Sequence, residues 1–104
     1  MEGIELISFQ IIASVGSARS LYIEAIHQAK LGFFEEAYKL IQKGNEAFVE
    51  GHQVHANLIE KEANGEINEI QVLLVHALDL LMSAEAFGIL AIEFIDIYKT
   101  LYTK

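Results

Sequence analysis

No proline occurs anywhere in the 104 residues of this chain. Proline ends or kinks a helix, because its ring removes a backbone donor and clashes with the preceding turn. A chain without proline can therefore run long uninterrupted helices, and 53% hydrophobic residues supply the apolar surface to pack them. We expect a helical protein with a packed core rather than a disordered chain.

Two glycines mark the breaks between helices. Gly32 follows Lys30, a cation suited to a helix C-terminus, and fits the position just past a helix end. The pair Asn64-Gly65 is the second break, since glycine readily adopts positive φ. These breaks predict helices over about 3–30, 33–63 and 67–102 within one domain, residues 1–104. Because short connections join antiparallel neighbours, the expected fold is all-α, an antiparallel up-down-up three-helix bundle.

Apolar residues recur at three- and four-residue spacing through the first two segments, the period of an amphipathic helix. Gly44 and Gly51 fall on the apolar stripe of the second segment, where each costs about 1 kcal/mol of helix propensity. Close approach of a neighbouring helix would compensate this cost. The small residues within 13–18 indicate that the first helix is that neighbour.

The third segment is apolar almost all the way round between Ile70 and Met82. A three-helix bundle leaves roughly half of each helix facing water, so such a helix needs cover from elsewhere. Other copies of the same chain around a symmetry axis are the simplest cover. We therefore expect a homo-oligomer whose centre is built by the third helix.

Charge and composition exclude several classes of protein. Fifteen acidic against seven basic residues give a formal charge of −8, which disfavours nucleic-acid binding and favours a basic protein partner. The absence of cysteine excludes disulfides, thiolate metal sites and cysteine nucleophiles. No stretch of about 18 uncharged residues occurs and the N-terminus is acidic, so we expect neither a transmembrane helix nor a signal peptide. A cytoplasmic protein is the resulting expectation.

His76 and Asp79 are the only polar side chains between Val72 and Met82, and they lie three residues apart on adjoining parts of one helical face. A lone histidine in an apolar helix is more often a hydrogen-bonded core residue than a catalyst, but two titratable groups together make both interpretations comparable. A buried carboxylate must be paired, protonated or bound to a cation. No Lys or Arg occurs between Lys61 and Lys99, so the nearby candidates are His76 or a metal ion.

The remaining histidines form weaker candidate sites. His52 and His55 are three residues apart with Glu62 further along, which could bind a divalent metal but lacks the His-Glu-x-x-His spacing. Ordinary helix-packing histidines are the favoured interpretation. His27 lies near the end of the first helix, where an imidazolium interacts well with the helix dipole. No glycine-rich phosphate loop occurs, and nothing places a serine beside His76 in a strained turn.

Several short elements along the chain form a characteristic series. In order, they are Ala18-Arg19-Ser20-Leu21, Ala29-Lys30-x-Gly32-x-Phe34, His52, Leu58-Ile59-x-x-Glu62-Ala63-x-Gly65-Glu66 and Val75-His76-Ala77-x-Asp79-x-Leu81-Met82. With these elements the chain resembles the lactose/cellobiose-type (lactose/cellobiose/diacetylchitobiose) enzyme IIA components of the bacterial phosphoenolpyruvate-dependent sugar phosphotransferase system. The likeness covers nearly the whole chain, and its most specific part is the element around His76.

The resemblance implies a phosphocarrier that works as a homotrimer of three-helix subunits. His76 would take a phosphoryl group from phospho-HPr on Nε2 and pass it to a cysteine of a IIB component, for uptake of a β-linked disaccharide through a membrane IIC carrier. Asp79 would lie at the trimer axis, where three copies share a divalent cation such as Mg²⁺. Residues three apart point about 60° apart, so His76 can line an intersubunit cleft while Asp79 faces the axis.

The chain also departs from the family pattern. Leu78 and Leu80 stand where a glutamine and a second histidine are usual, and His55-Ala56 stands where Gln-Thr is common. These losses leave Ser83, one heptad after His76, as a candidate donor to the phosphoryl oxygens. A diverged, non-catalytic helical interaction or regulatory module is the alternative function. The sugar cannot be identified, because IIA proteins meet carrier proteins rather than carbohydrate.

Overall fold

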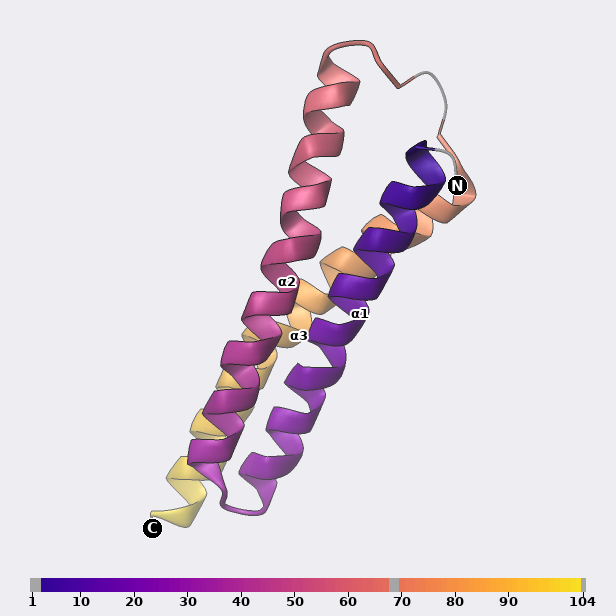
Figure 1. Cartoon of the computed structure of the whole chain (residues 1–104). Helices are drawn as coiled ribbons and strands as arrows, with labels where there is room; N and C mark the ends of the chain where they lie inside the picture. The colour runs from indigo at the N-terminus through magenta and orange to yellow at the C-terminus, as the bar shows by residue number, and fades with distance from the viewer. Residues whose placement is uncertain (1–2, 68–69, 104) are drawn as a thin grey trace.

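The computed structural model describes residues 3–67 and 70–103 and contains the helices α1 (Gly3–Lys30), α2 (Phe34–Ala63) and α3 (Val72–Tyr102). Helix α2 runs antiparallel to both others, and the C-terminus lies at the same end as the turn between α1 and α2 (Figure 1). The described residues contain no strand. The expected all-α, up-down-up three-helix bundle is confirmed.

The turn between α1 and α2 closes as the glycine predicts. Gly32 has φ +86°, a conformation that costs other residues strain. Its N–H donates to Ala29 O at 3.0 Å and that of Phe33 to Gln28 O at 3.0 Å, which is the Schellman pattern. The Tyr102 hydroxyl, at the end of α3, donates to Lys30 O at 2.8 Å. The last turn of α3 is thereby fixed to this end of the bundle.

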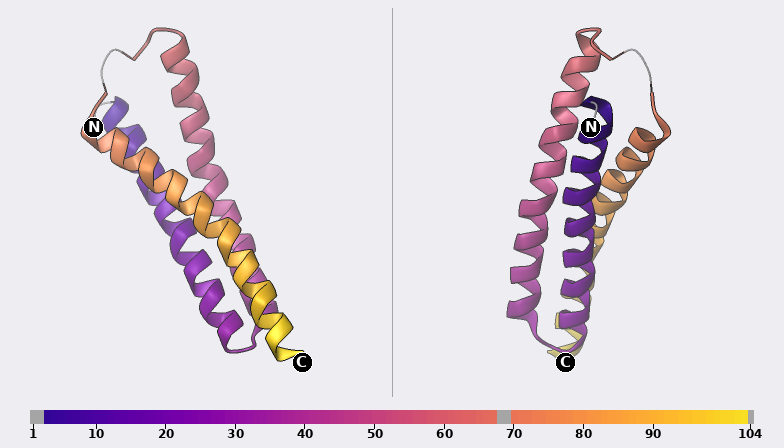
Figure 2. Two further views of the ribbon diagram at one scale, coloured as in Figure 1. Left: turned by 180° about the vertical axis from the view of Figure 1, so that it is seen from behind. Right: turned by 45° about the vertical axis from the view of Figure 1, so that its right-hand side comes forward.

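The start of α3 was predicted wrongly. The expected helix began at residue 67, whereas α3 begins at Val72, after Gln71 in an extended conformation (φ −101°, ψ 148°). Residues 68–69 of the expected segment lie outside the described part of the chain. The described residues 66–67 and 70–71 are not helical, and α3 diverges from α2 at this end of the bundle (Figure 2).

Tyr22 of α1 joins all three helices near the middle of the bundle. A Cβ built on Gly44 of α2 would lie 2.6 Å from its ring, and one on Gly88 of α3 would lie 3.0 Å from it. The Tyr22 hydroxyl donates to Asn45 Oδ1 at 2.7 Å, and burial raises the pKa of this phenol above its usual value. Gly51 similarly lies against Val15, 2.7 Å from the position a Cβ would take. The predicted close approach of α1 to the two glycines of α2 is confirmed.

Candidate functional site

His76 and Asp79 lie on the first turns of α3, on its outer side. Asp79 is two residues from both Ala77 and Leu81, which are buried, so its carboxylate points about 160° away from that side. Both His76 and Asp79 are exposed in the protomer. Within residues 3–67 and 70–103, neither side chain makes a hydrogen bond or ion pair. The imidazole is therefore free to meet a partner molecule rather than fixed in the core.

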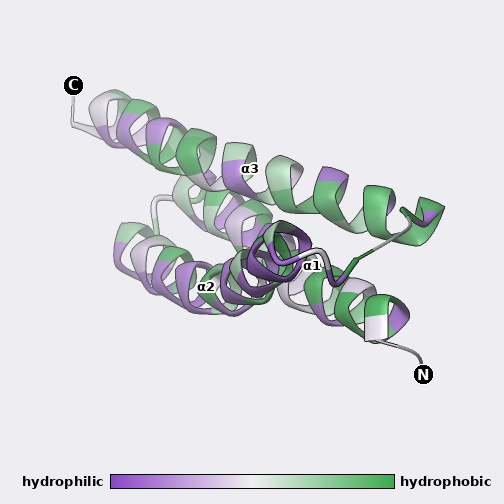
Figure 3. Cartoon of the chain, turned by 90° about the horizontal axis from the view of Figure 1, so that it is seen from above, coloured by the Kyte–Doolittle hydropathy of each residue, from purple (hydrophilic) through white to green (hydrophobic). Residues whose placement is uncertain are grey.

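The surface of α3 around Asp79 is apolar. Val72 is 87% exposed, Met82 70% and Ile89 60%, although each is a side chain that burial would stabilise by about 1.5–3 kcal/mol. Figure 3 shows hydrophobic colour on much of α3, in contrast to the more mixed colouring of α2. The buried side of the same helix consists of three alanines and three large aliphatic residues: Leu74, Ala77, Leu81, Ala84, Ala91 and Ile95.

Helices α1 and α3 are long and apolar enough to cross a membrane, by length and composition alone. This criterion is weak, because core helices of soluble proteins also meet it. Helix α3 carries Asp79, Glu85, Glu93 and Asp96 at exposed positions. Each carboxylate would be costly in hydrocarbon, so the physical argument favours protein rather than lipid as the cover for α3.

The two leucines that depart from the family pattern contribute to packing. Leu78 and Leu80 are partly buried and pack against the cluster formed by Ile11, Val15, Ala77, Leu81 and Ala84. Both side chains therefore contribute to packing within the protomer. Ser83 lies seven residues, or about 10 Å along the helix, from His76, and its role as a donor to the phosphoryl oxygens stays a prediction.

The alternative metal site on α2 is not assembled. The rings of His52 and His55 have centroids 6.5 Å apart, and His52 packs beside Phe48 at 6.0 Å. In the described part of the chain, no three His, Asp or Glu side chains come together as ligands, so His52, His55 and Glu62 are not brought to one point. His27 lies 3.6 Å from Glu24, one turn earlier on the exposed side of α1.

Arg19 is a polar residue at the bundle surface for which the sequence indicated no role. Its guanidinium carbon lies 4.8 Å from the centre of the Phe87 ring, so the cation of α1 covers an aromatic residue of α3. Its Nε is buried and donates no hydrogen bond. Leu80 forms the other wall of this α1–α3 groove of about 340 Å³. The sequence could have indicated that Arg19 forms no ion pair within its own helix, because no acidic residue stands three or four positions from it.

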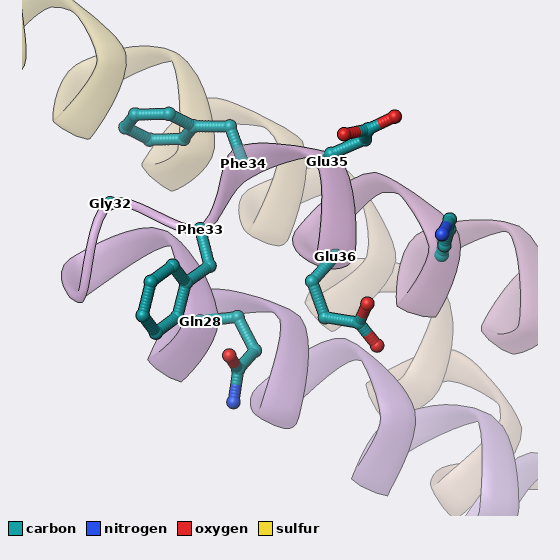
Figure 4. A pocket seen from close by; sticks show the side chains of 7 residues that line it. Gln28, Gly32, Phe33, Phe34, Glu35 and Glu36 are labelled. Carbon is teal, nitrogen blue, oxygen red and sulfur yellow. The ribbon is translucent and has the colours of Figure 1, made fainter.

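A hollow of about 620 Å³ lies at the turn between α1 and α2, beside Gln28, Phe33 and Glu36. Figure 4 shows the Phe33 ring near Gln28 and the carboxylate of Glu36 on the neighbouring turn of α2. His76 lies near the start of α3, at the opposite end of the bundle (Figure 1). This hollow therefore takes no part in chemistry at His76.

Comparison with known proteins identifies relatives along nearly the whole chain. The model of the family "PTS system, Lactose/Cellobiose specific IIA subunit" matches residues 6–99. The chain is 43% identical over 98 residues to the lichenan-specific phosphotransferase enzyme IIA component of Bacillus subtilis (strain 168), covering 94% of this chain and 89% of that one.

Solved structures agree with this result. The cellobiose-specific enzyme IIA from Bacillus anthracis superposes with a TM-score of 0.97 at 47% identity, covering 100% of this chain and 95% of that one. The IIA(chitobiose)–HPr complex of the Escherichia coli phosphotransferase system contains a chain with a TM-score of 0.84 at 32% identity, covering 98% and 99%.

Proposed function

Since the chain belongs to the lactose/cellobiose-specific IIA family of the phosphotransferase system, we propose that His76 is the residue on which it carries a phosphoryl group. The main structural support is that this imidazole is exposed on α3 and makes no hydrogen bond or ion pair within the described residues. HPr is the proposed donor, in line with the IIA–HPr complex among the similar structures. A IIB component is the proposed acceptor, and a β-linked disaccharide the proposed cargo of a membrane IIC carrier.

The imidazole suits both halves of such a transfer. The lone pair of a neutral ring nitrogen forms a bond to phosphorus while the bond from phosphorus to HPr breaks. A thiolate of IIB then forms its own bond to phosphorus, and the electrons of the N–P bond return to the ring. Loose phosphoryl-transfer transition states need positioning more than covalent assistance, so a rigid helix carrying one exposed imidazole is sufficient scaffolding. This reaction is expected in the cytoplasm, where the acidic surface would attract a basic carrier.

We further propose that three protomers associate around α3. The exposed apolar residues follow the Asp79 side of the helix at three- and four-residue spacing, which is the pattern of a helix–helix seam. A threefold arrangement covers this seam and brings three Asp79 carboxylates to the axis. Residues that belong to the seam are Val72, Val75, Asp79, Met82, Ala86, Leu90, Glu93 and Ile97.

A shared divalent cation, Mg²⁺ in the simplest case, fits this arrangement. Carboxylate oxygens are the ligands that Mg²⁺ prefers, and Asp79 has no cationic partner among the described residues. Three unneutralised carboxylates at one axis would oppose assembly. The cation would neutralise them and hold the subunits together, and His76 would remain at the side of the seam.

Phosphorylation of the intact protein tests the assignment of His76. The wild-type chain is incubated with enzyme I, HPr and phosphoenolpyruvate, and its mass is measured. We expect one phosphoryl group per chain, lost in acid and retained in base, and none on His76→Ala. His52→Ala is the matched control and should accept the group normally, because His52 is exposed on a different helix. Label retained by His76→Ala would show that another residue carries it.

The packing of Leu78 and Leu80 bears on the non-catalytic alternative. Both leucines pack against the protomer core, and we propose that phosphoryl transfer at His76 proceeds without the glutamine and second histidine that are usual in the family. An intact trimer that takes no phosphoryl group from HPr would nevertheless establish the regulatory alternative.

A further inference from the structure

Arg19 and Glu85 are unpaired opposite charges on the two sides of α3. Arg19 shares the α1–α3 groove with Leu80 and covers the Phe87 ring, and its Nε is buried without an acceptor. Glu85 is exposed beside Asn45 and lies in no ion pair with another described residue. A buried N–H without an acceptor is costly, and in a protein of formal charge −8 acidic partners are plentiful.

The two residues lie on opposite edges of the seam. Successive residues of a helix point about 100° apart. Relative to Asp79, the side chains of Leu80 and Phe87 therefore point about 80–100° to one side of α3, and that of Glu85 points about 120° to the other side. The first edge is the groove between α1 and α3, which contains Arg19. The second is the groove between α2 and α3, of about 210 Å³, where Glu85 lies.

Their positions along α3 also agree. Arg19 covers Phe87, which is two residues, or about 3 Å, from Glu85 along the helix. A rotation about an axis beside Asp79 leaves this height unchanged and turns the α1–α3 edge of one protomer towards the α2–α3 edge of the next. A closed ring of this kind needs two complementary edges. The α1–α3 edge carries Arg19 and the α2–α3 edge carries Glu85, at about the same height along α3.

We propose that Arg19 of each protomer binds Glu85 of the neighbouring copy, so that three such pairs close the ring. The proposal rests on the trimer proposed above and names the contact that selects a second copy of this chain as the partner. An uncharged or basic residue in place of Glu85 would leave the guanidinium unpaired, and the pair therefore discriminates between this chain and other helical proteins with an apolar seam.

Charge reversal tests the pair. Arg19→Glu, Glu85→Arg and the double variant are compared with the wild type by sedimentation equilibrium at low and high salt. We expect each single reversal to weaken the trimer by at least about tenfold, because three like-charged contacts replace three attractive ones, and the double variant to recover most of this loss. Added salt should reduce the difference between variants. Lys39→Glu and Glu60→Arg, both exposed on α2, are the matched controls and should assemble normally.

Folding is checked by circular dichroism. If Arg19→Glu does not fold, Arg19→Gln and Glu85→Gln replace the reversals, and the double variant should lose no more than either single one. The proposed ion pair would be refuted if the single variants assemble like the wild type, or if the double variant loses as much trimer affinity as both single variants together. Neither result would contradict the trimer itself. A wild-type protein that stays monomeric at high concentration would refute the trimer itself.

Discussion

Gly44→Ala tests whether Tyr22 is held as rigidly as the packing indicates. The added Cβ would lie 2.6 Å from one carbon of the Tyr22 ring and 2.8 Å from another, closer than real contacts allow. The ring cannot move away easily, because Gly88 lies on its other side and Asn45 holds its hydroxyl. The helices must separate, or the tyrosine must leave its rotamer.

The magnitude follows from two opposing contributions. Alanine is a better helix former than glycine by about 1 kcal/mol. Overpacking a filled site costs about 1–3 kcal/mol. Gly44→Ala should therefore lower the free energy of unfolding by up to about 2 kcal/mol.

Gly16→Ala is the control. No heavy atom outside its own helix backbone lies within 4 Å of the position its Cβ would take, so only the gain in helix propensity remains. This variant should be stabilised by about 1 kcal/mol. The predicted difference between the two variants is thus about 1–3 kcal/mol, which is the overpacking contribution alone.

Urea unfolding measures the free energy of unfolding of both variants. The protein concentration is kept the same in every experiment, because association of the chains makes the unfolding midpoint depend on concentration. Sedimentation checks that the oligomeric state is unchanged. Equal stabilisation by both substitutions would refute the reasoning, because it would mean that the space beside Gly44 accepts a methyl group and that Tyr22 is not confined.

Two further predictions concern Tyr22 and Asp79. Tyr22→Phe removes the hydrogen bond to Asn45 and should cost about 0.5–1.5 kcal/mol in urea unfolding. Because burial raises the pKa of Tyr22 above 10.0 in the folded protein, the folded state keeps this proton longer than the unfolded one, and wild-type stability should fall as pH rises through and beyond 10.0. Tyr22→Phe should show a weaker decline, and an equal decline would contradict the assignment to this phenol. Asp79→Leu should fold, because the carboxylate faces away from the core, and should make assembly insensitive to chelation of divalent ions, whereas the wild-type trimer should weaken when EDTA is added. Equal responses to EDTA in both proteins would remove Asp79 as the metal ligand.

The sequence alone determined most of the architecture. The absence of proline, the two glycine breaks and the regular apolar spacing correctly predicted three helices in an up-down-up arrangement, and the ends of α1 and α2 to within one residue. Gly32 and Gly65 could be interpreted because only glycine adopts positive φ without strain, and both have it. The exposed position of His76 did not follow from the sequence, because the segment around it is apolar almost all the way round and a core histidine fitted it equally well.

Only the tertiary structure decided how these helices meet. The start of α3 at Val72, after the extended Gln71, was not marked by a local residue pattern. The confinement of Tyr22 between Gly44 and Gly88 joins residues from three helices. Likewise, Arg19 reaches Phe87 across 68 positions of sequence, and Leu78 and Leu80 prove to be packing residues. Spacing along one helix fixes which side a residue faces, but the partner on that side is set by contacts between helices that the period cannot encode.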